Sequence, residues 1–136
     1  MRTNKKQLYS LRLKPILKER VWGGDKFGQS AGESWEISGF EDESSLICNG
    51  FLEGNALYDI IETYMGDIVG DDIYKYYGNE FPLLIKTLDI NDKLSIQVHP
   101  DDETAYDRHN SYGKCEAWYI LDAKPGSVIY MGFNRD

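Results

Sequence analysis

The sequence predicts a mostly β protein, a barrel or sandwich that carries a few short helices. Over the first 54 residues, short apolar groups alternate with glycines and acidic turns, and strand-like apolar runs return after residue 81. Only one segment, residues 57–65, has its apolar side chains at the spacing of an amphipathic helix, which we expect to end at Gly66 or Gly70. The chain has 136 residues without a repeat or an evident linker, so we expect a single domain over 1–136.

Charge and composition exclude several classes of function. Lys and Arg number 15 against 23 Asp and Glu, which gives a net charge of −8 and argues against nucleic acid or an anionic membrane as partner. Hydrophobic residues make up 41%, too many for a disordered acidic chain. The sequence has no apolar run of about 20 residues, and its first residues lack the apolar stretch of a signal peptide, so we expect neither a membrane helix nor a secretion signal. Because Cys48 and Cys115 are too few for a disulfide scaffold, we expect a cytoplasmic protein.

The second half of the chain supplies the clearest strand and helix signals. Residues 94–99 alternate strictly between apolar and polar side chains, as a β-strand does. The acidic residues after Pro100 are typical of a helix start, and a short helix is expected to run toward His109. Further strands are expected at 81–88, 117–121 and 127–133, with a turn at 124–126 before the last of them.

The alternation in residues 94–99 separates a polar from an apolar face. Its faces carry Ser95, Gln97 and His99 on one side and Leu94, Ile96 and Val98 on the other, the latter expected in the core. A solvated polar face is the common outcome of such a pattern. The Ser95 hydroxyl, the Gln97 amide and the His99 imidazole are, however, an unusual set for a face exposed to solvent. Inside a small barrel these side chains would line the lumen.

A second candidate strand brings Lys114, Glu116 and Trp118 to one face. If it lies near the first strand, Glu116 and His99 can converge on one cation. Imidazole and carboxylate suit zinc, and the amide oxygen of Gln97 is a weaker neutral ligand. The spacing alone does not decide this, because no established metal-binding motif reinforces it.

Several other polar residues have a structural explanation as well as a functional one. Lys86 lies within an apolar strand, where its ammonium either reaches solvent at a sheet edge or faces the polar lumen. Cys115 alternates away from Glu116 and is expected to fill a small space in the core, whereas His109 is expected on the surface. The acidic run 101–103 resembles a carboxylate metal site but is explained more simply as helix capping.

Five motifs, in order, resemble the N-terminal part of type I mannose-6-phosphate isomerases, most closely the shorter bacterial form. They are PILKERVWGG (15–24), GESWEIS (32–38), FPLLIK (81–86), LSIQVHPDD (94–102) and GKCEAWY (113–119). The resemblance implies a cupin fold, a jelly-roll β-barrel that is either complete or incomplete in this chain, with zinc at its mouth. It implies that His99 and Glu116 are zinc ligands and that Gln97, which corresponds to a ligand in some members, is a further candidate.

The same resemblance implies an isomerase that interconverts mannose 6-phosphate and fructose 6-phosphate. Lys86 and Lys114 are then the candidates for contacting the substrate's phosphate or the enediolate, and Ser95 for a hydrogen bond to the sugar or phosphate. Enzymes of this family are more than twice as long and take a further histidine ligand and an arginine from beyond residue 136, so we expect an inactive fragment with an incomplete zinc site. The alternative is a non-catalytic cupin-like binding or assembly module that self-associates through exposed sheet edges.

Overall fold

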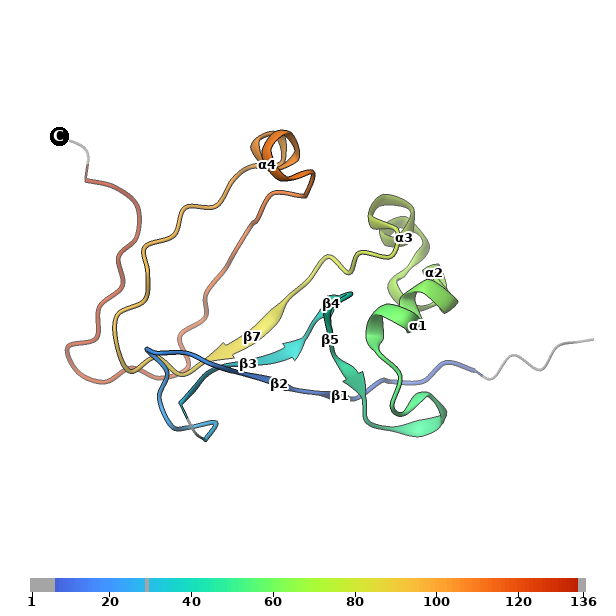
Figure 1. Cartoon of the computed structure of the whole chain (residues 1–136), viewed down its shortest axis with the longest axis horizontal. Coiled ribbons are helices and arrows are strands. Elements are labelled where there is room, and N and C mark those ends of the chain that lie inside the picture. The colour runs from blue at the N-terminus through green and yellow to red at the C-terminus, as the bar shows by residue number, and fades with distance from the viewer. Residues whose placement is uncertain (1–6, 29, 135–136) are drawn as a thin grey trace, which may run out of the picture. The chain divides into compact units, whose positions relative to one another are not determined.

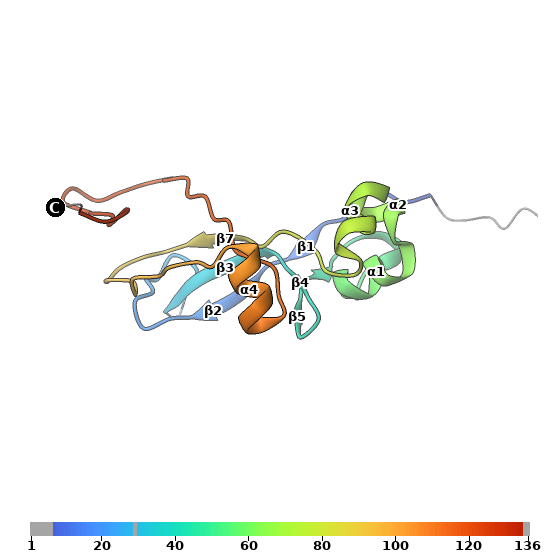
Figure 2. The same cartoon turned by 90° about the horizontal axis from the view of Figure 1, so that it is seen from above.

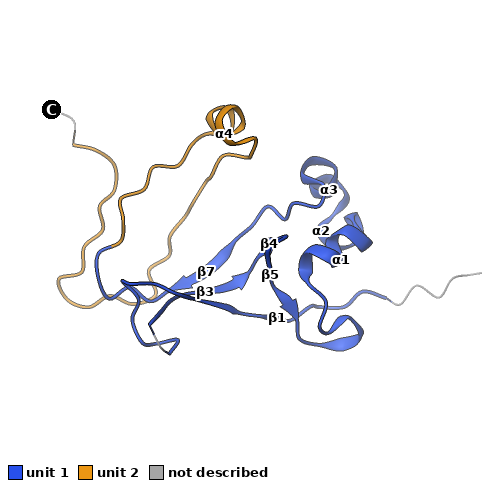
Figure 3. Cartoon of the chain, in the orientation of Figure 1, with its two compact units in different colours: residues 1–93 blue, residues 94–136 orange. Residues whose placement is uncertain are grey.

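A computed structural model describes residues 7–28 and 30–134 of the chain. It comprises two compact units, residues 1–93 and residues 94–136, which Figure 3 distinguishes by colour. The first unit contains all the strands of the described residues, and the second contains a single helix. No helix in the described parts of the chain has the length and apolarity that a membrane crossing requires.

A three-stranded antiparallel sheet is the largest element of the first unit. Its strands lie in the order β2–β3–β7, side by side in both Figure 1 and Figure 2, and they are β2 (Ile16–Glu19), β3 (Ala31–Ile37) and β7 (Ile85–Leu88). The central strand β3 is buried from Ala31 to Trp35. The register sets Trp35 opposite Lys86 of β7, which fixes where the polar side chains of this sheet meet.

Two smaller strand pairs and a group of helices complete the first unit. The strand pairs join β1 (Leu13–Lys14) to β6 (Leu46–Ile47) and β4 (Gly39–Phe40) to β5 (Glu43–Ser44). The helices are the 3₁₀-helix η1 (Gly50–Leu52), α1 (Leu57–Tyr64), α2 (Gly66–Val69) and α3 (Asp71–Tyr77). The short strands and tight turns predicted for the first 54 residues are therefore confirmed.

The predicted amphipathic helix, α1, packs its apolar face into the hydrophobic core of this unit. Ile60 of α1 packs with Ile47 and Leu52, because the apolar stripe of the helix faces β6 and η1. The helix ends at Tyr64 rather than at a glycine, since Met65 takes a positive φ of 52° and its N–H bonds back to Ile61. A Met in the left-handed half of φ space is uncommon, which is why the sequence favoured the following glycines.

The second unit contains the other predicted helix, α4 (Asp102–His109). Asp101 is its N-cap and accepts a hydrogen bond from the Thr104 N–H at 2.9 Å, so the capping interpretation of the acidic run is confirmed. This hydrogen bond also holds the pKa of Asp101 below its usual value. His109 is exposed, as expected.

The strands predicted at 94–99, 117–121 and 127–133 do not form in the structure. Their apolar side chains are exposed: Ile96 is 88% and Val98 76% accessible, so the expected burial of that face is wrong. A β-strand needs a neighbouring strand to pair with its backbone, and no strand of the described residues pairs with these segments. For the same reason the described residues do not close into a barrel.

Candidate active site

The candidate site of the second unit lies on the two chain segments that lead into and out of α4. Residues 94–100 run toward the helix and residues 113–118 return from it, and the Lys114 N–H donates to the Pro100 carbonyl at 3.1 Å. This hydrogen bond sets the two segments next to each other although neither belongs to a sheet. The sequence left open whether the two segments would lie side by side as strands; they lie side by side as the two arms of a loop.

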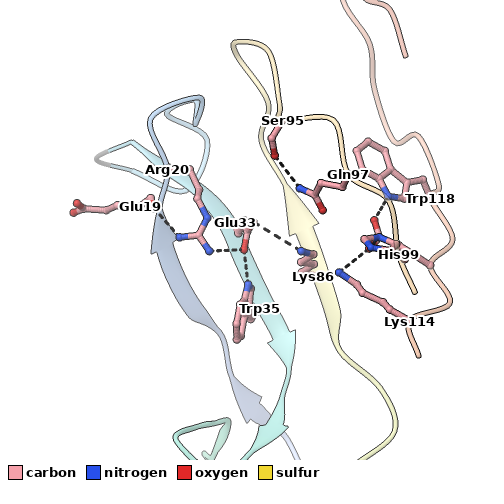
Figure 4. A network of polar contacts seen from close by, with 11 residues as sticks. Glu19, Arg20, Glu33, Trp35, Lys86, Ser95, Gln97, His99, Lys114 and Trp118 are labelled. Atoms are coloured by element: carbon pink, nitrogen blue, oxygen red, sulfur yellow. Dashed lines mark hydrogen bonds and ion pairs between the residues drawn. The ribbon is translucent and has the colours of Figure 1, made fainter. Parts of the chain in front are cut away.

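His99 and Glu116 meet across these two arms, in the cluster where Figure 4 labels His99, Lys114 and Trp118. The distance from His99 Nε2 to Glu116 Oε2 is 3.2 Å, and the two side chains are 26% and 25% exposed. Lys114 Nζ lies 3.1 Å from the same carboxylate oxygen. The structure therefore brings together three of the predicted site residues, an imidazole, a carboxylate and an ammonium, at an accessible position.

Trp118 fixes the other oxygen of the Glu116 carboxylate. Its indole N–H donates to Glu116 Oε1, which leaves Oε2 facing His99 and Lys114. This hydrogen bond has the largest effect on the pKa of Glu116, which it lowers. Burial raises that pKa, whereas the hydrogen bond from Lys114 and the charges of Lys114 and His99 lower it further, and the result is a pKa of about 2. Glu116 is thus ionised at neutral pH. The alternation placed Trp118 on this face without indicating that it would hold the carboxylate.

Ser95 and Gln97 contact each other on the incoming arm. Gln97 Nε2 donates to Ser95 Oγ at 3.1 Å, which agrees with their predicted position on one face. This hydrogen bond uses the amide nitrogen of Gln97 and leaves its amide oxygen as the atom that could serve as a ligand. Cys115 is exposed, so the prediction that it fills a space in the core is wrong: residues 117–121 form no strand whose opposite face could pack against it.

Lys86 belongs to the first unit and to a separate polar cluster on the sheet. Its ammonium lies 3.8 Å from Glu33 Oε1 and its side chain is 26% exposed, so it neither reaches freely into solvent nor stands alone in an apolar strand. Glu33 also accepts hydrogen bonds from Trp35 Nε1 at 2.6 Å and from Arg20 Nη2 at 3.0 Å (Figure 4). Glu33 was not predicted from the sequence as a residue of a polar cluster. The one feature that could have indicated it is a charged side chain within the buried part of a strand.

Glu33 is expected to make the stability of the fold depend on pH. Burial raises its pKa, but the hydrogen bonds from Trp35 and Arg20 and the charges of Lys86 and Arg20 outweigh burial and hold the pKa below 4.5. A carboxyl with a depressed folded-state pKa stabilises the fold above its unfolded pKa and loses that contribution as the pH falls through the folded value. Glu33→Gln should therefore lower the free energy of unfolding by about 1–3 kcal/mol at pH 7 and by less below pH 4.5.

Urea unfolding followed by far-ultraviolet circular dichroism at several pH values measures this difference. Glu19→Gln is the matched control, because Glu19 is exposed in β2 next to Arg20 and its loss should change the unfolding free energy by no more than about 0.5 kcal/mol. An equal and pH-independent effect of both substitutions would contradict the stabilising role of Glu33.

The donor atoms of His99 and Glu116 fit a zinc ion as two of its ligands. Zinc binds imidazole nitrogen and carboxylate oxygen at about 2.0–2.2 Å, which places two tetrahedral ligand atoms roughly 3.3 Å apart. The observed 3.2 Å between Nε2 and Oε2 agrees with this value, and the ionised carboxylate suits a metal ligand. No cluster of three His, Cys, Asp or Glu side chains occurs among residues 7–28 and 30–134.

The comparison with protein families places these motifs in a known catalytic domain. Residues 10–128 match the catalytic domain of phosphomannose isomerase type I, and the chain belongs to this family. The family has a cupin fold, so the predicted fold class is confirmed at this level although the described residues do not form a closed barrel.

Individual relatives are mannose-6-phosphate isomerases of bacteria. The chain is 39% identical over 91% of its length to a probable mannose-6-phosphate isomerase of Bacillus subtilis and 38% identical over 89% to the mannose-6-phosphate isomerase ManA of that species. A crystal structure of the Bacillus subtilis mannose 6-phosphate isomerase matches 84% of the chain with a TM-score of 0.71 and 34% identity. The chain spans about 40% of the length of these relatives: 41%, 40% and 38%.

Proposed function

We propose that this chain supplies the metal-binding part of a zinc-dependent isomerase that interconverts mannose 6-phosphate and fructose 6-phosphate. The observation that carries the proposal is the contact between His99 and Glu116, at 3.2 Å, with Lys114 on the same carboxylate. All three residues lie in motifs that resemble the family, and the family match covers them. A cytoplasmic location belongs to the same proposal and is supported by two cysteines that are both free thiols.

The reaction moves a proton between C1 and C2 of the sugar through a cis-enediol. His99 and Glu116, with the amide oxygen of Gln97 as a neutral donor, are the residues that would hold zinc. Bound there, zinc would polarise the sugar oxygens and stabilise the negative charge that develops on them. Trp118 orients the Glu116 carboxylate through its hydrogen bond.

The chain's own cations supply the remaining charge complementarity. Lys114 lies beside the proposed ligand pair, so we assign its ammonium to the oxyanion of the enediolate. Lys86 is assigned to the substrate phosphate, because a chain of net charge −8 needs a local cation to bind an anionic sugar. The Ser95 hydroxyl is assigned to a hydrogen bond with the sugar or its phosphate.

A chimera tests this proposal directly. Residues 10–128 of this chain would replace the matching residues of the mannose-6-phosphate isomerase ManA of Bacillus subtilis, and the protein so obtained is called the chimera below. We expect the chimera to contain one zinc per chain and to convert mannose 6-phosphate in a coupled assay. A folded chimera that contains zinc and has no turnover would contradict the proposal and favour the non-catalytic binding module.

The chain of 136 residues by itself is expected to bind zinc weakly and to show no isomerase activity. Catalytic zinc sites normally take three protein ligands, and His99 and Glu116 are the two strong donors of the proposed set. Metal analysis of the purified chain, followed by the coupled assay, measures both quantities. Stoichiometric zinc with measurable turnover from this chain alone would show that its residues complete the site.

A further inference from the structure

Residues 100–114 form a loop around α4 whose base lies next to His99 and Glu116. Helix α4 ends at His109, where Asn110 takes a left-handed φ of 50° and donates its N–H to the Tyr106 carbonyl. The chain then turns back, with the Ser111 N–H bonding to the Ala105 carbonyl at 3.4 Å. The helix and this turn return the chain to the point where it entered the loop.

Two hydrogen bonds close the base of the loop. One joins the Lys114 N–H to the Pro100 carbonyl at 3.1 Å, and the other joins the Gly113 N–H to Asp102 Oδ1 at 2.9 Å. The backbone approaches so closely here that a Cβ on Gly113 would stand 2.6 Å from the Asp101 carbonyl carbon and from the Asp102 nitrogen. Position 113 therefore requires glycine for space.

The two acidic residues at the start of α4 have different partners. Asp101 caps the helix through the Thr104 N–H, whereas Asp102 Oδ1 reaches across to the returning arm. An acidic first turn is ordinarily explained by the helix dipole alone. The hydrogen bond of Asp102 to Gly113 is a long-range contact that the dipole does not require.

Several large apolar side chains of the two arms are exposed. Ile96 and Val98 on the incoming arm are 88% and 76% exposed, and Tyr119 on the returning arm is 87% exposed. Neither arm belongs to a β-ladder in the described part of the chain. Together with the His99–Glu116 contact itself, the hydrogen bonds at the loop base join the two arms in the register in which His99 faces Glu116.

We propose that Asp102 and Gly113 are positioning residues that hold His99 and Glu116 at ligand distance through the base of the α4 loop. His99 precedes Pro100 directly, and Glu116 follows Lys114 by two residues, so a shift at the base moves both side chains. Geometry set in this way lowers the cost of assembling a metal site, because the ligands are already placed when the ion arrives. The relevance to metal binding rests on the function proposed above, whereas the positioning itself does not.

Nuclear magnetic resonance of this chain tests the positioning without metal or substrate. The readout is the nuclear Overhauser contact between the His99 ring protons and the side-chain protons of Glu116. Asp102→Ala and Gly113→Ala should each lose this contact. Asp101→Ala is the matched control and should keep it, because Asp101 serves the helix cap only. Asp102→Asn should also keep it, since its amide oxygen can accept from the Gly113 N–H.

A second measurement connects the loop base to the proposed metal site. In the chimera, Asp102→Ala should weaken zinc binding by about tenfold in competition with a chelator, and Asp102→Asn should restore most of the affinity. Persistence of the His99–Glu116 contact in Asp102→Ala, or its absence from the unsubstituted chain, would overturn the positioning role. An unsubstituted chimera that keeps the His99–Glu116 contact but binds no zinc would instead contradict the proposed function.

Discussion

His99→Ala and Glu116→Gln, each introduced into the chimera, are expected to remove most of the bound zinc and to abolish isomerisation. The two side chains face each other at 3.2 Å and supply the strong donors of the proposed set. Good zinc sites bind with about 10–16 kcal/mol, so the loss of one of three ligands should cost roughly a third of this. That corresponds to about a 10³-fold weaker affinity.

The matched controls for these substitutions lie on α4. His109→Ala removes the other histidine of the chain, which is exposed, and Glu103→Gln removes an exposed carboxylate in the first turn of the helix. Both should keep stoichiometric zinc and turnover, provided that circular dichroism shows a folded protein. Near-normal zinc and turnover in both ligand variants would mean that His99 and Glu116 are not ligands.

Helices α1 and α4 were predictable from sequence because their determinants are local, whereas the short helices η1, α2 and α3 were not predicted. The apolar stripe ending in Tyr64 needs only the periodicity of one segment, and the N-cap Asp101 needs only Thr104 three residues away. The end of α1 was less predictable, since a positive φ at Met65 is decided by the chain that follows.

The strands expected after residue 93 were wrong for a different physical reason. Residues 94–99 have the alternation of a strand, yet a strand also requires a partner, and alternation contains no information about the partner. The expected burial of Ile96 and Val98 and of Cys115 depended on that partner, and the structure exposes all three. Pairing is a property of distant segments, and it is the part of the fold that sequence patterns specify least.

The sequence indicated which two side chains could meet at the candidate site and indicated less about what surrounds them. His99 and Glu116 were expected to meet if their segments were neighbours, and the α4 loop makes them neighbours by local hydrogen bonds. The sequence predicted neither the cluster around Glu33 nor the hydrogen bond by which Trp118 orients the Glu116 carboxylate. Both depend on which side chain lies beside which in space, so no spacing along the sequence indicates them.

Lys114→Met and Lys86→Met, introduced into the chimera, are expected to impair different kinetic constants. Lys114 Nζ lies 3.1 Å from Glu116, beside the proposed ligands, where the proposed reaction would develop negative charge. Removal of a group that stabilises such an oxyanion typically costs about 10²–10³ in kcat, so Lys114→Met should lower kcat with little change in KM.

Lys86→Met should instead raise KM for mannose 6-phosphate while leaving kcat nearly unchanged. A charge-assisted hydrogen bond to a phosphate contributes about 1.5–3 kcal/mol, which corresponds to a roughly 10–100-fold higher KM. Unphosphorylated mannose separates the two roles, because the defect of Lys86→Met should disappear with that sugar and the defect of Lys114→Met should persist. Lys124→Met, at an exposed position in the second unit, is the control and should change neither constant.

The two kinetic patterns together decide whether the lysines are assigned correctly. Loss of kcat in Lys86→Met on both sugars would move that lysine from the phosphate to the reacting carbons. Its ion pair with Glu33 at 3.8 Å would then hold an ammonium that acts on the enediolate. A raised KM in Lys114→Met that vanishes on mannose would assign Lys114 to the phosphate. In that case the pairing of Lys114 with Glu116 would mean that the phosphate binds next to the metal ligands, and the oxyanion would depend on another cation.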